Sequence, residues 1–370
     1  MSVLDLLRRA PDVESPELVA VDATDRLLLD EAAAALALCG PGEVAVVDDN
    51  YGALTLGAVA LHGASDVRVS QDLLVGERAL ARNAERARLT GTYRSLPLGP
   101  DLARGARVVL VQAPKALEAL REIAEVIASA AAPDVTVLVG GRVKHMTHGM
   151  NDVLRDSFTD VSATLARQKS RVLVARGPRP GASSFPRTQE HADLGLVVHA
   201  HGAAFAGTKV DIGTRALLAC LDRMPSTGTA LDLGSGTGVL AVALARLHPG
   251  LEVIAADQSA AAVASAAATA KANGPADRIR VIRDDAADSL PEGSVDLVVL
   301  NPPFHVGAAV VTTVAERLFA AATRVLRPGG ELWTVYNSAL RYKPTLSRLV
   351  GPTRVVEQSP KFTVTVSTRR

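Results

Sequence analysis

The sequence predicts an α/β protein with two domains, each built on a mostly parallel sheet that helices cover on both faces. Short apolar runs alternate with helical patterns in both halves of the chain. A stretch rich in proline and glycine separates the halves. The length of 370 residues also fits two domains, at roughly 150 residues for each.

The boundary is predicted at Arg176-Gly-Pro-Arg-Pro-Gly-Ala-Ser-Ser-Phe-Pro186. Two glycines and three prolines disfavour both a continuing helix and a central strand, so we expect a linker here. We therefore predict one domain over residues 1–180 and a second over residues 187–370.

The second half contains the clearer alternation of elements. Each predicted strand is a short apolar run, and each predicted helix carries apolar residues at helical spacing. Pro328-Gly-Gly330 is expected to stop the last helix before the next strand begins. We expect strands at 229–233, 251–256, 280–283, 295–300, 331–336, 353–356 and 361–368, and helices at 239–247, 259–272 and 315–325.

The first half repeats this plan. Residues 46–52 align with residues 232–238, and residues 109–115 align with residues 298–304. The distance between the two landmarks is nearly equal in the two halves, which indicates an internal duplication. We expect strands at 43–47, 66–70, 107–111 and 135–139, and helices at 54–61 and 73–88.

The composition excludes several classes of protein. Hydrophobic residues make up 48% and charged residues 21% of the chain, an ordinary globular balance. The net charge of +1 argues against a strongly basic nucleic-acid coat. Cys39 and Cys220 form no CxxC pair, so we expect neither a disulfide framework nor a metal site. Without a signal peptide or a long apolar span, we expect a soluble, cytoplasmic monomer.

Leu231-Asp-Leu-Gly-Ser-Gly-Thr-Gly238 joins a predicted strand to a predicted helix. Its glycines allow a tight turn and a close approach of the backbone to a ligand. A dinucleotide fingerprint would need glycine at Val239, and Asp232 would repel a pyrophosphate but suit a cationic or amino-bearing ligand. Asp257 follows the next strand, where a carboxylate can accept both hydroxyls of a ribose. The combination resembles the S-adenosylmethionine site of Rossmann-like methyltransferases; a purely structural turn is the alternative.

Asn301-Pro-Pro-Phe304 follows another predicted strand, and its tandem prolines hold the backbone extended. The Asn301 amide oxygen and the Pro302 carbonyl can accept hydrogen bonds from an exocyclic amine, while Phe304 stacks on the ring that carries it. Because such an amine is a poor nucleophile, two acceptors aimed at its hydrogens would favour a pyramidal nitrogen with its lone pair facing a methyl group. A structural proline-rich loop is the alternative.

A polar residue followed by two prolines and an aromatic residue marks methyltransferases that act on adenine N6, guanine N2 or glutamine amide nitrogens. Asn301-Pro-Pro-Phe-His305 resembles specifically the ribosomal RNA guanine-N2 methyltransferases. Residues 205–215 resemble the segment that precedes the glycine loop in that family. Residues 47–54, 111–115 and 141–144 resemble the first domain of its large-subunit enzyme more than that of its small-subunit enzyme.

The resemblance implies two tandem Rossmann-like domains with seven-stranded sheets, the first a degenerate copy. It implies methyl transfer from S-adenosyl-L-methionine to the N2 amine of a guanine, with ribosomal RNA or a pre-ribosomal particle as the partner. The implied catalytic residues are Asn301, Pro302 and Phe304. The implied cofactor-binding residues are Thr214, Asp232, Gly234, Ser235, Gly236, Thr237, Gly238, Asp257, Asp285 and Asn301, with Asp284 as an alternative to Asp285.

Other functions remain open from the residues alone. A protein glutamine methyltransferase or an adenine-N6 methyltransferase would use the same Asn-Pro-Pro-Phe motif, and a cofactor-binding RNA chaperone would need no rapid turnover. We expect the first domain to help recognise RNA or to support folding of the second. We expect it to bind no cofactor, because Val46 takes the place of Asp232 and residues 48–50 take the place of Gly-Ser-Gly.

Overall fold

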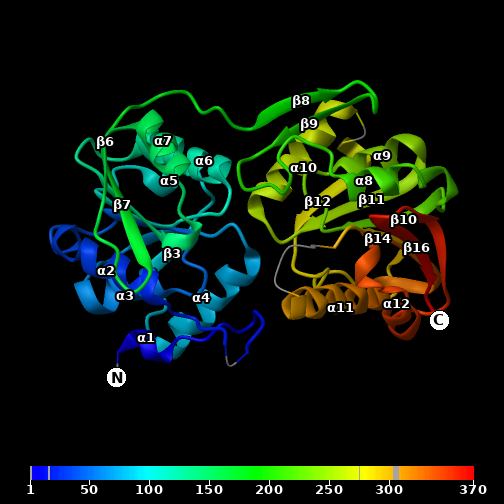
Figure 1. Ribbon diagram of the computed structural model, residues 1–370, viewed down its shortest axis with the longest axis horizontal. Coiled ribbons are helices and arrows are strands. Elements are labelled where there is room, and N and C mark those ends of the chain that lie inside the picture. Colours follow the sequence, from blue (N-terminus) through cyan, green and yellow to red (C-terminus); the bar gives the residue numbers. More distant parts are fainter. Residues whose placement is uncertain (1, 16, 275, 303–307) are drawn as a thin grey trace. The chain divides into compact units, whose positions relative to one another are not determined.

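The computed structural model describes residues 2–15, 17–274, 276–302 and 308–370. The chain forms two compact units, Met1–Phe185 and Pro186–Arg370, whose elements are labelled in Figure 1. Each unit contains a seven-stranded sheet, and in each sheet five neighbouring strands are parallel and the last two pairings are antiparallel. The predicted class, two tandem α/β domains with mostly parallel sheets, is confirmed.

The first unit has the strand order β3-β2-β1-β4-β5-β7-β6. Its strands are β1 Val44–Val47, β2 Val67–Ser70, β3 Tyr93–Ser95, β4 Val108–Gln112, β5 Thr136–Arg142, β6 Phe158–Ala163 and β7 Ser170–Pro178. Its helices are α1 Val3–Leu6, α2 Ala23–Leu36, α3 Ala53–His62, α4 Leu74–Ala87, α5 Pro100–Ala103, α6 Leu117–Ala130, the short 3-10 helix η1 Val143–His145, and α7 His148–Ser157.

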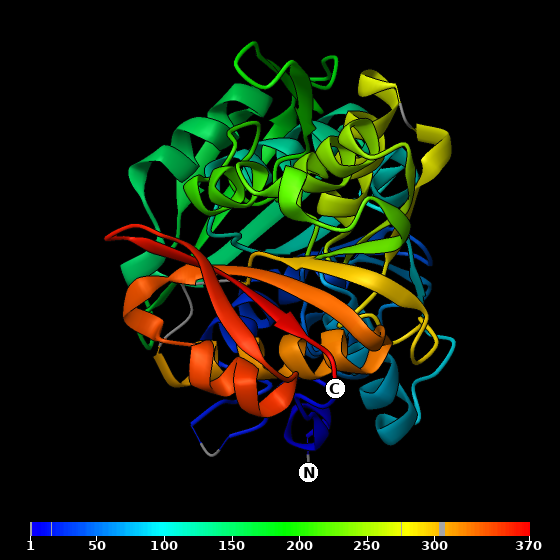
Figure 2. The same cartoon turned by 90° about the vertical axis from the view of Figure 1, so that its right-hand side faces the viewer.

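The second unit has the corresponding order, β12-β11-β10-β13-β14-β16-β15, as an internal duplication requires. Figure 2 shows its red C-terminal strands beside the orange β14. The strands are β10 Thr227–Leu233, β11 Gly250–Asp257, β12 Ile279–Arg283, β13 Val295–Leu300, β14 Leu326–Asn337, β15 Thr353–Gln358 and β16 Phe362–Thr368. The helices are α8 Ile212–Leu218, α9 Val239–Leu247, α10 Ala260–Asn273, α11 Ala308–Val325 and α12 Lys343–Leu349, with 3-10 turns η2 Leu221–Arg223, η3 Ala276–Arg278 and η4 Ser338–Leu340.

Both sheets are buried on both faces, because successive residues of a strand point to opposite sides. In β13, Leu297 and Val299 join the core formed with α8, α9 and α10. Val298 and Leu300 join the core formed with α11 and α12, on the other side of the sheet in Figure 1. The first sheet is likewise covered by α1 to α4 on one face and by α5 to α7 on the other. This packing explains why the central strands are continuous apolar runs.

A hairpin outside the large sheets begins the second unit. It consists of β8 Arg187–His191 and β9 Leu196–Ala200, which pair antiparallel. Side chains of α10 bond to the backbone of β9: the Asn273 amide oxygen accepts from Val197 N–H at 2.9 Å, and the Thr269 hydroxyl accepts from His199 N–H at 3.1 Å. The open edge of the hairpin is therefore paired with a helix instead of with another strand.

Two strands run through segments that we predicted to be breaks. β7 continues into the expected linker as far as Pro178, where the partner residue is Phe158 of the edge strand β6. Proline is tolerated there because the pairing with β5 has already ended at Arg176. Likewise, α11 ends at Val325 as expected, but β14 begins at Leu326 and not after the glycines. Its register with β13 shifts there, so residues 327–330 form a bulge.

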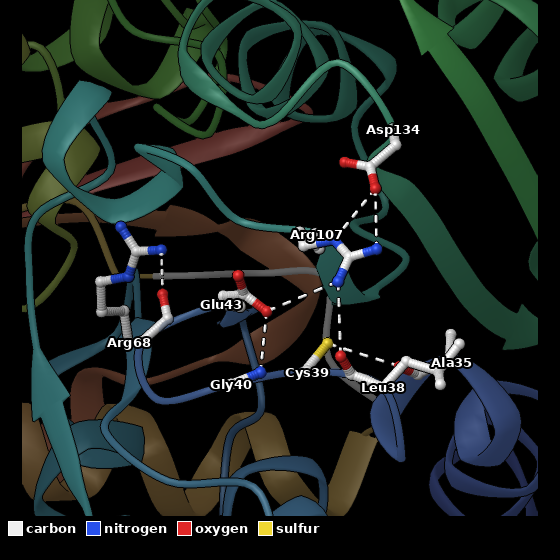
Figure 3. A network of polar contacts seen from close by, with 9 residues as sticks. Ala35, Leu38, Cys39, Gly40, Glu43, Arg68, Arg107 and Asp134 are labelled. Carbon is white, nitrogen blue, oxygen red and sulfur yellow. Dashed lines mark hydrogen bonds and ion pairs between the residues drawn. The ribbon is translucent and has the colours of Figure 1, made fainter.

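Two arginines tie loops together at the amino ends of the first sheet (Figure 3). The Arg107 guanidinium lies 2.8 Å from an Asp134 carboxylate oxygen and 3.8 Å from Glu43, at a partly exposed position. Arg68 is buried, and it donates to three backbone carbonyl groups, those of Gly42, Asp101 and Arg104, at 2.6, 3.0 and 2.7 Å. A buried cation bound by carbonyl groups alone indicates a structural cross-link.

Within the described ranges, no helix combines the length and the apolar character needed to cross a membrane.

Candidate active site

The predicted site residues converge at the carboxyl edge of the second sheet. The glycine loop follows β10, Asp257 ends β11, Asp284 and Asp285 follow β12, and Asn301 follows β13. These four strands are parallel neighbours, so their carboxyl ends share one edge. The chain order reverses between β10 and β13, and open α/β sheets bind ligands at such a switch point.

Two glycines of the loop leave room for a ligand. Gly234 and Gly236 have φ values of 74° and 52°, a region that side chains other than glycine rarely adopt. A Cβ atom added to either residue would meet nothing within 4 Å. The loop is held to β11 by Gly234 N–H, which donates to the Ala256 carbonyl at 2.8 Å. The backbone of the loop is thus held in place, and the space on the side of the missing Cβ atoms of Gly234 and Gly236 is empty of described atoms.

The rest of the loop supports this surface from behind. Gly238 precedes α9 with a φ of 78°, and a Cβ atom there would come within 2.9 Å of Ala266 in α10. Glycine is therefore required at position 238, both by the turn and by the close packing of α9 against α10. Ser235 and Thr237 are buried, and the Ser235 hydroxyl has no hydrogen-bond partner among the described atoms.

Asp257 connects the loop to the start of α10. One carboxylate oxygen accepts from Gly236 N–H and the other from Ser259 N–H, each at 2.9 Å. A carboxylate has about four acceptor positions, so its capacity can serve backbone N–H groups and the hydroxyl groups of a ligand at the same time. Asp257 is only partly buried, which keeps that capacity accessible from the carboxyl edge.

Asp232 lies deeper than the loop that it precedes. It is 1% exposed, and its carboxylate accepts from Ala241 N–H in the first turn of α9 at 3.0 Å. Burial, with a smaller effect from nearby Asp257, raises its pKa to about 7. The ligand contact that the sequence motif indicates for this acid stays a prediction, and the structure adds a contact of its carboxylate with a helix N-terminus.

The two adjacent acids after β12 have different partners. Asp284 accepts from the backbone and the hydroxyl of Ser289 at 3.0 and 2.7 Å, which closes its own loop. Asp285 forms an ion pair of 2.6 Å with Arg317 of α11. Both acids are buried. Asp284 thus binds within its own loop, while Asp285 binds the exposed side chain of Arg317 on another element.

Asn301 has an amide whose two ends are in different environments. Its Nδ2 group donates to Asp211 and to the Thr214 hydroxyl, both at 3.2 Å. Its Oδ1 atom is buried and has no partner among the described atoms. Pro302 is also buried. Phe304, the third predicted catalytic residue, lies outside the described residues.

Asp211 is a residue of this cluster that the sequence did not single out. It caps α8 by accepting from Gly213 N–H at 2.9 Å, and the same oxygen accepts from Asn301. Thr214, predicted to approach the cofactor, lies in the first turn of α8 beside the Asn301 amide. The Asp-x-Gly-Thr run that begins a helix was the available signal, but only as a cap.

The corresponding edge of the first sheet keeps the backbone of the loop but not its glycines. Asp48 and Asn50 have φ values of 57° and 59°, matching Gly234 and Gly236, and Gly52 precedes α3 as Gly238 precedes α9. Gln71 occupies the place of Asp257, and its amide oxygen accepts from Asn50 N–H at 2.8 Å. Side chains therefore stand where the second unit has open space.

Comparisons with known proteins cover both units. The model of the family described as RLMG N-terminal domain matches residues 4–179, and that of the Methyltransferase small domain matches residues 195–366. The chain is 35% identical over 368 residues to ribosomal RNA large subunit methyltransferase G of Pseudomonas aeruginosa, with 98% of this chain and 96% of the relative covered. It is 33% identical to the protein of the same name from Streptomyces avermitilis, over 97% and 95% of the two chains.

A solved structure resembles the whole chain as well. It is the T. thermophilus 16S rRNA N2 methyltransferase RsmC in complex with AdoMet and guanosine. The TM-score is 0.75 at 25% identity, and 94% of this chain and 92% of that chain are covered. The likeness therefore extends over both units and is not restricted to the sheet with the glycine loop.

Proposed function

Because the chain belongs to the family of ribosomal RNA large subunit methyltransferase G, we propose that it transfers a methyl group from S-adenosylmethionine to the exocyclic N2 amine of a guanine in ribosomal RNA. The names of the relatives point to RNA of the large subunit as the substrate. A solved neighbour that holds both AdoMet and guanosine supports the cofactor and the base.

The observation that carries this proposal is the state of the Asn301 amide. Its Oδ1 atom is buried at the carboxyl end of β13, next to the switch point of the sheet, and has no hydrogen-bond partner among the described residues. A buried acceptor without a donor is unfavourable unless a ligand supplies one. The amine of a guanine is such a donor, and the Pro302 carbonyl would accept its second hydrogen.

The residues around the glycine loop fit S-adenosylmethionine. The space beside Gly234 and Gly236 admits a ligand against the backbone. We propose that Asp257 binds the ribose hydroxyls and that Asp285 reaches the adenine amine, after exchange of its bond to Arg317. Asp232 supports the loop by capping α9. Ser235, Thr237, Gly238 and Thr214 complete the proposed cofactor side of the site.

The residues of this chain act mainly by positioning the target amine, and less by transferring protons. The bound cofactor supplies an electrophilic methyl group on a cationic sulfur. Asn301 and Pro302 hold the two amine hydrogens, so that the nitrogen lone pair points along the line of transfer. Phe304 stacks on the base in this proposal. No strong base is required of the protein, because the nitrogen carries a positive charge once it has gained the methyl group and then readily loses a proton to water.

The first unit has a different task in this proposal, since side chains fill its loop. We propose that it recognises RNA or supports folding of the second unit, and that the enzyme acts as a cytoplasmic monomer. Lys115, Lys144 and Lys169 are exposed at the carboxyl edge of its sheet, where they could contact phosphates. Replacing all three by alanine should flatten the salt dependence of RNA affinity if RNA recognition is the task; an unchanged slope would leave folding support.

The test of the reaction is methylation of ribosomal RNA from a strain that lacks the gene. Purified enzyme, labelled S-adenosylmethionine and either naked RNA or isolated large subunits should give N2-methylguanosine, identified by mass spectrometry of the nucleosides. Asn301→Ala should reduce the single-turnover rate by about a hundredfold while cofactor affinity is kept. Labelled N6-methyladenosine, or label on protein alone, would refute the proposed substrate.

A further inference from the structure

We propose that Asp211 is a positioning residue for methyl transfer, acting through Asn301. Its carboxylate, together with the Thr214 hydroxyl, fixes the Asn301 amide so that Oδ1 faces the target amine. This inference rests on the proposed function and adds to it a residue without a contact to the substrate. It gives Asp211 a task beyond capping α8.

The hydrogen bonds decide which way the Asn301 amide points. An ionised carboxylate can only accept, so the end of the amide that faces Asp211 must be the NH₂ group. The Thr214 hydroxyl lies 3.2 Å from the same nitrogen and can accept its second hydrogen. A flipped amide would place two oxygens against each other and would turn donors toward the amine of the substrate. The Asp211 carboxylate, which can only accept, therefore selects the productive orientation, because the Thr214 hydroxyl could donate to an oxygen as readily as it accepts from the NH₂ group.

Asp211 is itself held in place. The oxygen that accepts from Asn301 also accepts from Gly213 N–H at 2.9 Å, which ties it to the first turn of α8. A Cβ atom at Gly213 would lie 3.0 Å from both Asn301 Oδ1 and Asp211 Oδ2. The absence of a side chain at this position lets α8 approach the end of β13 closely enough for the contact.

The first unit contains a related contact, which defines the competing explanation. Gln112, at the position of Asn301, donates its amide to Asp25 in the first turn of α2. Asp22 caps that helix as Asp211 caps α8. The amide contact could therefore serve only to join helix and strand. The second unit differs because, within the part of the chain that the structure describes, the Asn301 amide oxygen is buried and has no hydrogen-bond partner, a combination that Gln112 does not share.

Three substitutions separate positioning from capping. Asp211→Asn keeps an oxygen that can accept from both Gly213 and Asn301, so we expect a single-turnover rate within a few-fold of the parent. Asp211→Ser keeps a good helix cap but is too short to hold Asn301, so we expect the rate to fall about 10- to 100-fold. Cofactor affinity and melting temperature should be nearly unchanged in both. Asp22→Ser, which alters the matching cap in the first unit, should leave the rate unchanged.

The decisive measurement is Asp211→Ser made in Asn301→Ala protein. If Asp211 acts through Asn301, the double variant is no slower than Asn301→Ala alone. An equal loss in both backgrounds, or a full rate for Asp211→Ser with rRNA, would overturn the positioning role. Absence of N2-methylguanosine with the parental enzyme would instead refute the proposed function, so the two failures can be told apart.

Discussion

Replacing Asp257 by alanine should weaken binding of S-adenosylmethionine more than the loss of one surface contact would. The carboxylate holds Gly236 N–H and Ser259 N–H at 2.9 Å each, and we propose that it also binds the ribose. The substitution therefore removes the ligand contact and frees the loop at the same time. Losing a hydrogen bond to a charged group costs about 1.5–3 kcal/mol, which corresponds to a dissociation constant roughly 10- to 150-fold higher.

Asp257→Asn is a stricter test of the role of the carboxylate, because asparagine has nearly the same shape as aspartate. An amide has one oxygen, so only one of the two backbone N–H groups could keep its acceptor, and the NH₂ group would oppose the other. We expect Asp257→Asn to bind the cofactor nearly as poorly as Asp257→Ala. If binding depended on shape alone, the asparagine variant would keep the parental affinity.

The assay is isothermal calorimetry on the full chain, with circular dichroism to establish folding. The parent should bind one cofactor molecule per chain. In the first unit, the side chains of Asp48, Asn50 and Gln71 occupy the space that a cofactor would need. Gln71→Ala is the matched control, because Gln71 accepts from Asn50 N–H as Asp257 accepts from Gly236 N–H, and it should leave affinity unchanged. A folded Asp257→Ala protein with affinity within threefold of the parent would remove Asp257 from the site.

Three further substitutions test the energetics of charged side chains, two of them buried and one partly exposed. Because burial raises the pKa of Asp232 to about 7 from 3.8, the native state keeps a proton that the unfolded chain has lost, so stability should fall as pH rises from about 4 to 7. Asp232→Asn should remove the contribution of Asp232 to this decline, measured as the free energy of unfolding in urea at several pH values. If the parent and the variant differ in this free energy by the same amount at pH 5 and pH 8, the explanation is contradicted. Arg68→Met should cost about 3 kcal/mol, because the buried Arg68 side chain loses hydrogen bonds to three backbone carbonyl groups, at roughly 1 kcal/mol each. Arg107→Met, which breaks partly exposed ion pairs, should destabilise the protein much less than Arg68→Met, and equal losses in chemical denaturation would contradict this difference.

Most of the second sheet was predictable because its strands are buried on both faces. The bounds of α9 and β13 agree with the expectation to the residue, since a continuous apolar run and a turn mark each of them. The breaks were less predictable. Proline and glycine stop a central strand, but Pro178 pairs at a sheet edge and residues 327–330 bulge out of β14. Whether such residues end a strand depends on which neighbours the strand has.

The roles of the acids were predictable only in part. The position of Asp257 at a strand end could be read from the chain, because it depends on local pattern alone. The partners of Asp284 and Asp285 could not be assigned, since one bonds within its own loop and the other bonds to α11. For Asp232 the ligand contact that the motif indicated stays a prediction, and the bond of its carboxylate to Ala241 N–H in α9 became visible only in the fold.

The two α/β domains, the glycine loop and the amide at the end of β13 could be predicted from the chain, because each depends on residues that are near one another in sequence. The internal duplication followed from comparing two such local patterns. The orientation of that amide, in contrast, follows from the fold. Asp211 and Asn301 are separated by 90 positions, and their hydrogen bond forms because α8 packs close to the carboxyl end of β13. An acid that caps a helix can be recognised from its neighbours in sequence, but the side chain that it holds across the sheet can be found only from the fold.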